Sequence, residues 1–236
     1  MLGAGTVFKN LKYVYSKVEV SEGAETPANA LEVVADTATE EANTIKISKL
    51  KANVSFIKVT ADYEPKVGDF VVGAWDDSEE NVLGATSGGN KCHISSELTP
   101  IEVDGATVKI KGLTQKTGEE GWLETNLAQH TVESFKRAIV GKEVDSLIKG
   151  FVQIQTKSLV ELSDYLENIA FVGSMTDDTD VIIIMENAIC TSGFETDNKN
   201  KETSVVTTKF ECSADFNSGV FDTLPIYIFY PEKATA

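Results

Sequence analysis

The sequence predicts a mainly β fold, a sandwich or barrel-like arrangement of strands with one α-helix packed on it. Three observations support this prediction. Short segments rich in β-branched and aromatic residues follow one another along most of the chain, and turn residues separate them. Only one segment, at about residues 131–140, has the clear apolar spacing of an amphipathic helix. Hydrophobic residues make up 42% of the chain, which is enough for a packed core.

The first expected strands lie in the N-terminal third of the sequence. β-branched and aromatic residues are frequent in these segments, a composition that favours extended backbone. The segments are Val7–Val20, Thr44–Val59 and the short apolar stretch Phe70–Trp75. Their number and spacing fit a β-rich domain rather than a helical one.

The next region, Leu83–Leu113, indicates a glycine-rich turn, a strand, an acidic turn and a further strand. Asp104-Gly105 is a strong hairpin signal, because these two residues accept the backbone angles that tight turns require. The sequence therefore predicts a hairpin between Ile101–Val103 and Val108–Ile110.

The glycine-rich turn at Gly84–Lys91 invites comparison with a phosphate-binding loop. In that motif a glycine directly precedes Lys-Ser/Thr and a helix follows, so that backbone amides and the lysine converge on the phosphate. Here Asn90 separates Gly89 from Lys91, Cys92 stands in place of Ser/Thr, and a strand is expected next. These departures argue against a nucleotide site.

The expected helix begins at Thr131, a residue type that caps helix N-termini well. Phe135 and Ile139 lie one turn apart on the apolar face. Gly141 is expected to end the helix as the residue after its C-cap. A second helix candidate is Leu159–Tyr165, but the sequence SLVELSDYL at residues 158–166 also fits an extended segment.

The C-terminal part predicts further strands. Ala170–Met175 and Val181–Met185 flank an acidic turn and form an expected hairpin. Val206–Cys212 alternates apolar with polar residues, the pattern of a half-buried strand. Leu224–Tyr230 is the last expected strand, and residues 232–236 are expected to be a loose tail.

Residues 21–82 are predicted to contain an extended arm or hairpin. Within them an acidic stretch at residues 21–43 directly precedes a basic stretch at residues 44–58. These charges either pair locally on solvated strand faces or meet a neighbouring copy of the chain. Charge reversal at residues 46, 49 and 51 would distinguish the two alternatives. The candidate contact residues are Glu32, Asp36, Glu40, Glu41, Lys46, Lys49, Lys51 and Lys58.

The charge and hydropathy of the chain argue against two classes of function. The formal net charge is −16, and a folded protein of that charge repels phosphate, which disfavours sequence-independent binding of nucleic acid. No run of about 18 apolar residues is present, so no transmembrane helix is expected. The N-terminus lacks the pattern of a signal peptide, so the protein is expected to remain in the cytoplasm in which it is made.

The chain offers few residues for catalysis or metal binding. Its cysteines, Cys92, Cys190 and Cys212, are odd in number and far apart, which fits small buried thiols rather than a disulfide framework or a zinc site. The two histidines, His93 and His130, have no nucleophile or metal ligand at a recognised spacing. We therefore expect no enzymatic activity, no metal and no cofactor.

Two acidic clusters, at residues 177–180 and 197–200, raise the possibility of a calcium loop. Neither has the glycine at position 6 and the glutamate at position 12 that the calcium-binding loop requires. Both clusters are better interpreted as polar turns.

Four blocks of sequence, taken in this order, resemble the major tail proteins of phages, which are the subunits of the tail tube. They are LGAGTVFKN, LGATSGGNKCHISSELTPIEVDGATVKIKGL, GEEGWLETNLAQHTVESFKRAIVG, and a C-terminal block from YLENIAFVGSM through VIIIMENAICTSGFETDNKNKETSVVTTKFECSADF to LPIYIFYP. The resemblance covers about residues 83–231 and, more loosely, residues 1–20. It rests on the order of the blocks, and none of them contains a catalytic motif.

The resemblance implies a single tail-tube domain over residues 1–236, of the type found in long-tailed, siphovirus-like phages. Such subunits form rings, usually hexamers, that stack into a hollow tube in the virion tail after assembly in the host cytoplasm. DNA passes through an acidic lumen without specific binding. The implied partners are other copies of the chain and the tape measure, tail terminator and distal tail proteins.

Two other classes of function remain open. One is a different structural virion protein, such as a capsid decoration protein or a tail-spike domain, and the shape of the polymer in electron micrographs would distinguish it. The other is a hydrolase or binding module of the β-sandwich type. That class requires a cleft with convergent polar groups, and the sequence contains no recognisable set of them.

Overall fold

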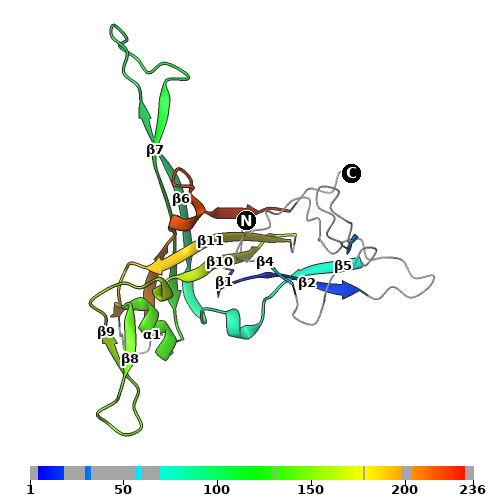
Figure 1. Cartoon of the computed structure of the whole chain (residues 1–236), viewed down its shortest axis with the longest axis vertical. Helices are drawn as coiled ribbons and strands as arrows, with labels where there is room; N and C mark the ends of the chain where they lie inside the picture. Colours follow the sequence, from blue (N-terminus) through cyan, green and yellow to red (C-terminus); the bar gives the residue numbers. More distant parts are fainter. Residues whose placement is uncertain are drawn as a thin grey trace, which may run out of the picture. The chain divides into compact units, whose positions relative to one another are not determined.

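The computed structural model describes residues 5–18, 30–32, 57–59, 70–129, 131–177, 179–197 and 204–231. The described chain is mainly β with one flanking α-helix, which confirms the predicted fold class. The chain divides into two compact units (Figure 1). Unit 1 comprises residues 1–10 and 82–236, and unit 2 comprises residues 11–81.

Unit 1 contains an eight-stranded sheet, a separate two-stranded sheet and the helix. The large sheet follows the order β1-β10-β11-β13-β7-β6, with β14 beside β11 and β12 beside β13. Its strands are β1 (Thr6–Lys9), β6 (Thr86–Pro100), β7 (Thr114–Leu127), β10 (Leu166–Ser174), β11 (Asp180–Cys190), β12 (Thr196–Asp197), β13 (Val205–Glu211) and β14 (Ile226–Phe229). The remaining elements of unit 1 are α1 (Val132–Ala138), β8 (Gly141–Val144), β9 (Gln153–Thr156), and the 3-10 turns η2 (Leu162–Asp164) and η3 (Phe216–Ser218).

Strand β11 connects two parts of the large sheet. It pairs along most of its length with β10, and on its other side with β14. It pairs with β13 only through Ile189 and Cys190. The main core cluster combines side chains of β1, β10 and β11 with Leu123 of β7 and Phe210 of β13. Both parts of the sheet therefore share one hydrophobic core.

The alternation predicted for Val206–Cys212 is confirmed. Along β13 every second residue is buried, and Phe210 is 2% exposed. The buried hydroxyl of Thr208 donates to the Thr125 carbonyl, at 3.4 Å, and the Thr125 hydroxyl donates to Asn90 Oδ1 at 2.6 Å. These bonds satisfy polar groups that would otherwise destabilise the core. The hairpin expected at residues 170–185 is also present, as β10 and β11.

The predicted hairpin between Ile101–Val103 and Val108–Ile110 is wrong. Asp104-Gly105 does form a turn, but the strands on either side of it are β6 and β7, and residues 101–113 form the loop between them. Four apolar residues of this loop, Ile101, Val103, Val108 and Ile110, are exposed and have no core to pack against in the described chain. Their β propensity is therefore not reinforced by burial, which is what most often turns propensity into a strand.

The glycine-rich turn expected at Gly84–Lys91 is mostly strand. Strand β6 begins at Thr86, and its pairing with β7 shifts register between Thr86 and Asn90. Gly88 and Gly89 within this shift have φ angles of +89° and +90°. They form a β-bulge that only glycine adopts easily, and no loop is present that could surround a phosphate.

The helix expected at residues 131–140 is confirmed as α1. The Thr131 hydroxyl accepts the Ser134 amide at 3.0 Å, and Ser134 Oγ accepts the Thr131 amide at 2.8 Å. The role predicted for Gly141 is wrong, because Val140 takes the left-handed conformation after the helix, with φ of 48°. Gly141 is buried at the start of β8, where an added Cβ would lie 3.0 Å from Ile154.

The segment at residues 158–166, which fitted two interpretations, contains the 3-10 turn η2 and then enters β10. Unit 2 contains a four-stranded sheet in the order β3-β5-β2-β4 and the 3-10 turn η1 (Glu79–Asn81). Its strands are β2 (Tyr13–Val18), β3 (Ala30–Glu32), β4 (Ile57–Val59) and β5 (Phe70–Trp75). The strand expected at residues 70–75 is confirmed as β5, and the segment expected at residues 7–20 is divided between β1 and β2.

Candidate functional site

Strands β6 and β7 continue well past the rest of the sheet. Strand β13 pairs with β7 only at Trp122–Leu127, whereas β6 and β7 pair with each other as far as Pro100 and Thr114. Residues 95–100 and 114–120, here called the distal ribbon, therefore have no third strand among the described residues. Figure 1 shows this ribbon extending away from the other strands of unit 1. A two-stranded ribbon is marginally stable alone, and its edges present backbone groups that can pair with another chain.

The ribbon and the loop at its end, residues 101–113, carry exposed apolar side chains. They are Leu98, Ile101, Val103, Val108 and Ile110. Val108 is 76% exposed, and all five side chains belong to residues 98–110 of the hairpin. Contiguous exposed apolar residues of this kind mark surfaces that associate with other proteins. We call residues 101–113 the ribbon tip.

The distal ribbon joins the rest of the sheet at residues 116–122 of β7, here called the ribbon base. The segment that leads into β14 contacts one face of this base. The amide of Leu224 donates to Glu119 Oε2 at 2.7 Å, and Lys116 Nζ lies 3.0 Å from the same carboxylate. These bonds hold the pKa of Glu119 below its usual value, and the bond from the Leu224 amide has the largest effect. An added Cβ at Gly121 would lie 2.4 Å from Ile226 Cδ1, so the segment packs closely on the strand. These contacts join the ribbon to the segment that precedes β14.

Trp122 dominates the other face of the base. The His93 ring stacks on it with ring centroids 4.9 Å apart, and the amino groups of Lys91 and Lys209 lie 5.1 and 4.7 Å from its centroid. Lys209 also contacts Glu211 at 2.7 Å, and this hydrogen bond holds the pKa of Glu211 below its usual value. His93 Nε2 lies 3.1 Å from Ser95 Oγ. These contacts give His93 a packing role in the sheet.

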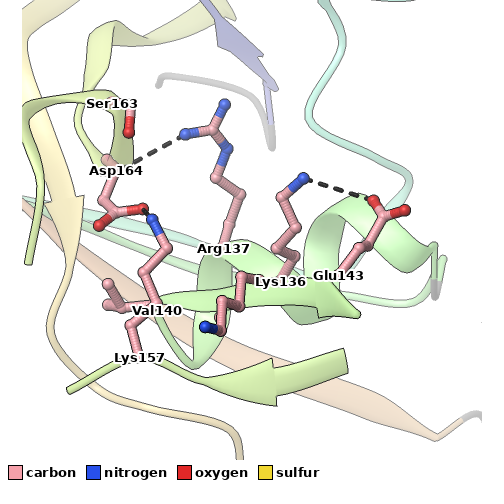
Figure 2. A pocket seen from close by; sticks show the side chains of 9 residues that line it. Lys136, Arg137, Val140, Glu143, Lys157, Ser163 and Asp164 are labelled. Carbon is pink, nitrogen blue, oxygen red and sulfur yellow. Dashed lines mark hydrogen bonds and ion pairs between the residues drawn. The ribbon is translucent and has the colours of Figure 1, made fainter. Parts of the chain in front are cut away.

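A cavity of about 520 Å³ lies between α1, β8 and η2 (Figure 2). Lys157 contacts Asp164 at 2.6 Å and Glu161 at 2.8 Å, and these bonds raise the pKa of Lys157. Burial is the largest single influence on Asp164 and opposes its ionisation, but the hydrogen bonds from Lys157 and the Glu161 amide, with the positive charges of Lys157 and Arg137, together keep the pKa of Asp164 below its usual value. Lys136 contacts Glu143 at 3.4 Å, and Arg137 Nη1 donates to the Asp164 carbonyl at 3.4 Å. The cavity thus has ion pairs that join helix, strand and turn.

The described residues offer little for metal or thiol chemistry. No group of three or more His, Cys, Asp or Glu side chains that could hold a metal ion occurs among them. Cys190 and Cys212 are buried, and burial raises the pKa of Cys212 to about 12, which keeps this thiol protonated and unreactive. Cys92 is partly buried, and burial raises its pKa as well. No helix in the described part is long and apolar enough to cross a membrane.

The contact residues proposed from charge fall largely outside the described residues. Asp36, Glu40, Glu41, Lys46, Lys49 and Lys51 are outside them, as are His130 and residues 232–236. Glu32 lies in β3 and Lys58 in β4, but their side chains are also outside the described part. Charge pairing between copies through these residues stays a prediction, as does an extended arm at residues 21–82.

The distal ribbon is the stronger candidate site. Of the charged groups in the cavity, Lys136, Lys157, Glu143 and Asp164 are engaged with one another or with Glu161, which fits a structural role. The ribbon instead presents strand edges and apolar side chains, whose chemistry is that of protein association.

No family model matches the sequence, and no curated protein matches it.

Proposed function

We propose that the chain is a structural virion protein that assembles into rings, which stack to form the tube of a phage tail. The observation that carries this proposal is the distal ribbon, with its strand edges and exposed apolar tip. A ribbon of this kind gains stability when further strands pair with it. A second copy of the chain supplies such strands, because its own ribbon has the same shape and the same unpaired strand edges.

The ribbon geometry favours a ring. Strand β6 is the last strand of its sheet, and among the described residues no strand pairs with β7 at residues 114–120 on the other side of the ribbon, where Glu119 contacts the Leu224 amide through its side chain. The β6 edge of one copy would pair with the β7 edge of the next, which is a head-to-tail contact between two different surfaces. Contacts of that type close into rings when the rotation between copies allows it. Closure would then remove every free ribbon edge.

The sequence supports the same function. The order of its motifs resembles that of phage major tail proteins, and its net charge of −16 suits the wall of a channel for DNA. An acidic wall repels the phosphate groups and lets DNA pass without being held. In this proposal the partners are other copies of the chain and the tape measure, tail terminator and distal tail proteins, and DNA is conducted rather than recognised.

We expect purified, concentrated protein to form rings of uniform diameter and tubes built from them. Negative-stain electron microscopy would show the polymers, and light scattering would give ring masses that are multiples of 25.5 kDa. In Leu98→Asp a charge replaces an exposed apolar side chain on the ribbon, so polymers should require at least about tenfold more protein, because burying a charge without a partner is costly. Leu98→Ile, which keeps the apolar surface, should assemble as the unaltered chain does.

Two results would contradict the proposal. A chain that stays monomeric at every concentration, with circular dichroism showing it folded, would exclude a self-assembling tube subunit. Polymers of another form, such as closed shells or isolated trimeric spikes, would instead favour a capsid decoration protein or a tail-spike domain.

A further inference from the structure

The loop between β8 and β9, residues 145–152, presents an unusual group of exposed apolar side chains. They are Leu147, Ile148, Phe151 and Val152. Leu147 is 92% exposed and Phe151 is 70% exposed. A single exposed leucine is ordinary, but four large apolar side chains within six consecutive residues of a hairpin end are not. We call residues 145–152 the β8–β9 tip.

Internal hydrogen bonds give the β8–β9 tip a defined shape. The Leu147 amide donates to Gln153 Oε1 at 3.4 Å, and the Phe151 amide donates to the Ile148 carbonyl at 3.2 Å. Ser146 Oγ donates to the Ile148 carbonyl at 2.9 Å. The backbone thus uses its polar groups within the loop and holds the apolar side chains outward. A surface ordered in advance loses less conformational entropy on binding.

Within unit 1 the β8–β9 tip and the ribbon tip lie at opposite ends (Figure 1). Both ends are hydrophobic: the ribbon tip carries Ile101, Val103, Val108 and Ile110. Two apolar ends on opposite sides of one body allow copies to join head to tail without limit if one end fits the other. The two ends cannot meet within unit 1, so a contact between them joins the unit 1 of one copy to the unit 1 of another.

Charge also favours a second copy as that molecule. The chain has a net charge of −16, so two copies repel each other overall. The two ends carry no net charge. In residues 142–153 two lysines balance two acidic residues, and in residues 97–116 three lysines balance three acidic residues. Apolar contact between copies therefore meets little electrostatic opposition at these ends.

We infer that the β8–β9 tip of one copy docks on the ribbon tip of another copy and forms the contact between successive rings. This inference rests on the proposed function and adds the axial contact to it. Lateral pairing of ribbon edges builds each ring, and the two apolar tips join one ring to the next. Phe151 and Leu147, as the large exposed side chains, are the main contributors from the β8–β9 tip.

The first test is the double variant Leu147→Ser/Phe151→Ser. Both side chains are exposed, so the melting temperature of the monomer should stay within a few degrees of the original value. Light scattering should still detect rings, whereas electron microscopy should show tubes only at concentrations at least about tenfold higher. Lys149→Ser changes the same loop without removing apolar surface, and its tubes should form normally.

The outcomes separate the two proposals. Tubes that form at the original concentration in the double variant would overturn the role of the β8–β9 tip and leave the tube function intact. Loss of the rings themselves in this variant would place the tip in lateral contacts and overturn its axial role. Failure of the unaltered chain to form rings or tubes would overturn the proposed function and the inference with it.

A cross-linking experiment tests the partner surface directly. Phe151→Cys and Val108→Cys are prepared as separate chains, mixed, allowed to assemble, and treated with a short bis-maleimide. Cross-linked dimers should appear in assembled mixtures and exceed those of either variant alone, which control for reaction at the native Cys92. Equal yields in the mixture and in the single variants would contradict docking of one tip on the other.

Discussion

Replacing Phe210 by alanine is expected to lower the free energy of unfolding of unit 1 by about 3–5 kcal/mol. The ring is 2% exposed in β13 and belongs to a cluster with Leu123, Met185 and Cys190. Its removal loses the burial of the ring and leaves a cavity between the two parts of the sheet, which rigid strands cannot fill completely. Urea unfolding followed by circular dichroism and by tryptophan fluorescence measures the loss.

Phe216→Ala is the matched control, since it removes the same side chain from an exposed site. Phe216 is 85% exposed, so its replacement should change the stability by no more than about 0.5 kcal/mol. Similar losses in the two variants would mean that Phe210 does not pack in the core as described. A change in the slope of the urea transition would instead indicate that the two units unfold separately.

Phe210 also shows which part of the fold the sequence predicts well. Alternation of apolar and polar residues identified β13, because one face of that strand is buried and the other is not. The helix was found for a similar reason, since its cap at Thr131 and its apolar face are both local features. In these elements the local pattern and the tertiary environment favour the same structure.

The distal ribbon could not be predicted in the same way. Its second strand begins with TQKTGEEG, at residues 114–121, which contains glycine and charged residues and no apolar alternation. This segment becomes a strand because β6 pairs with it, and such pairing can override intrinsic preference. Conversely, the apolar residues at Ile101–Val103 suggested a strand and lie in the ribbon tip. Their exposure is the signal that points to association, and it is visible only in three dimensions.

The cavity beside α1 was missed for a different reason. It brings Arg137 together with Asp164, which lies 27 residues further along the chain. Neither residue belongs to a motif of recognised spacing, so only the fold places them together. The charged residues proposed from sequence as contacts between copies were chosen because they are neighbours in sequence, and proximity in sequence does not show which surface they occupy.

The next largest loss of stability is expected for Gly5→Ala, at about 2–5 kcal/mol. Gly5 has φ of +64°, a conformation that costs a residue with a Cβ about 1–2 kcal/mol. The added Cβ would also lie 2.4 Å from Phe171 Cε2 and 2.6 Å from the Val172 carbonyl oxygen. Overpacking of this kind typically costs about 1–3 kcal/mol more. Thermal and urea unfolding of the variant measure the total.

Gly219→Ala separates the two contributions. Gly219 has nearly the same φ, +68°, and an added Cβ there would have no atom within 4 Å. It should therefore lose only the backbone contribution, and the difference between the two variants gives the cost of crowding Phe171. Equal losses would mean that the chain before β1 moves away from β10 at little cost. A larger loss at Gly5 requires that β1 be held firmly against β10, as their pairing from Thr6 to Lys9 indicates.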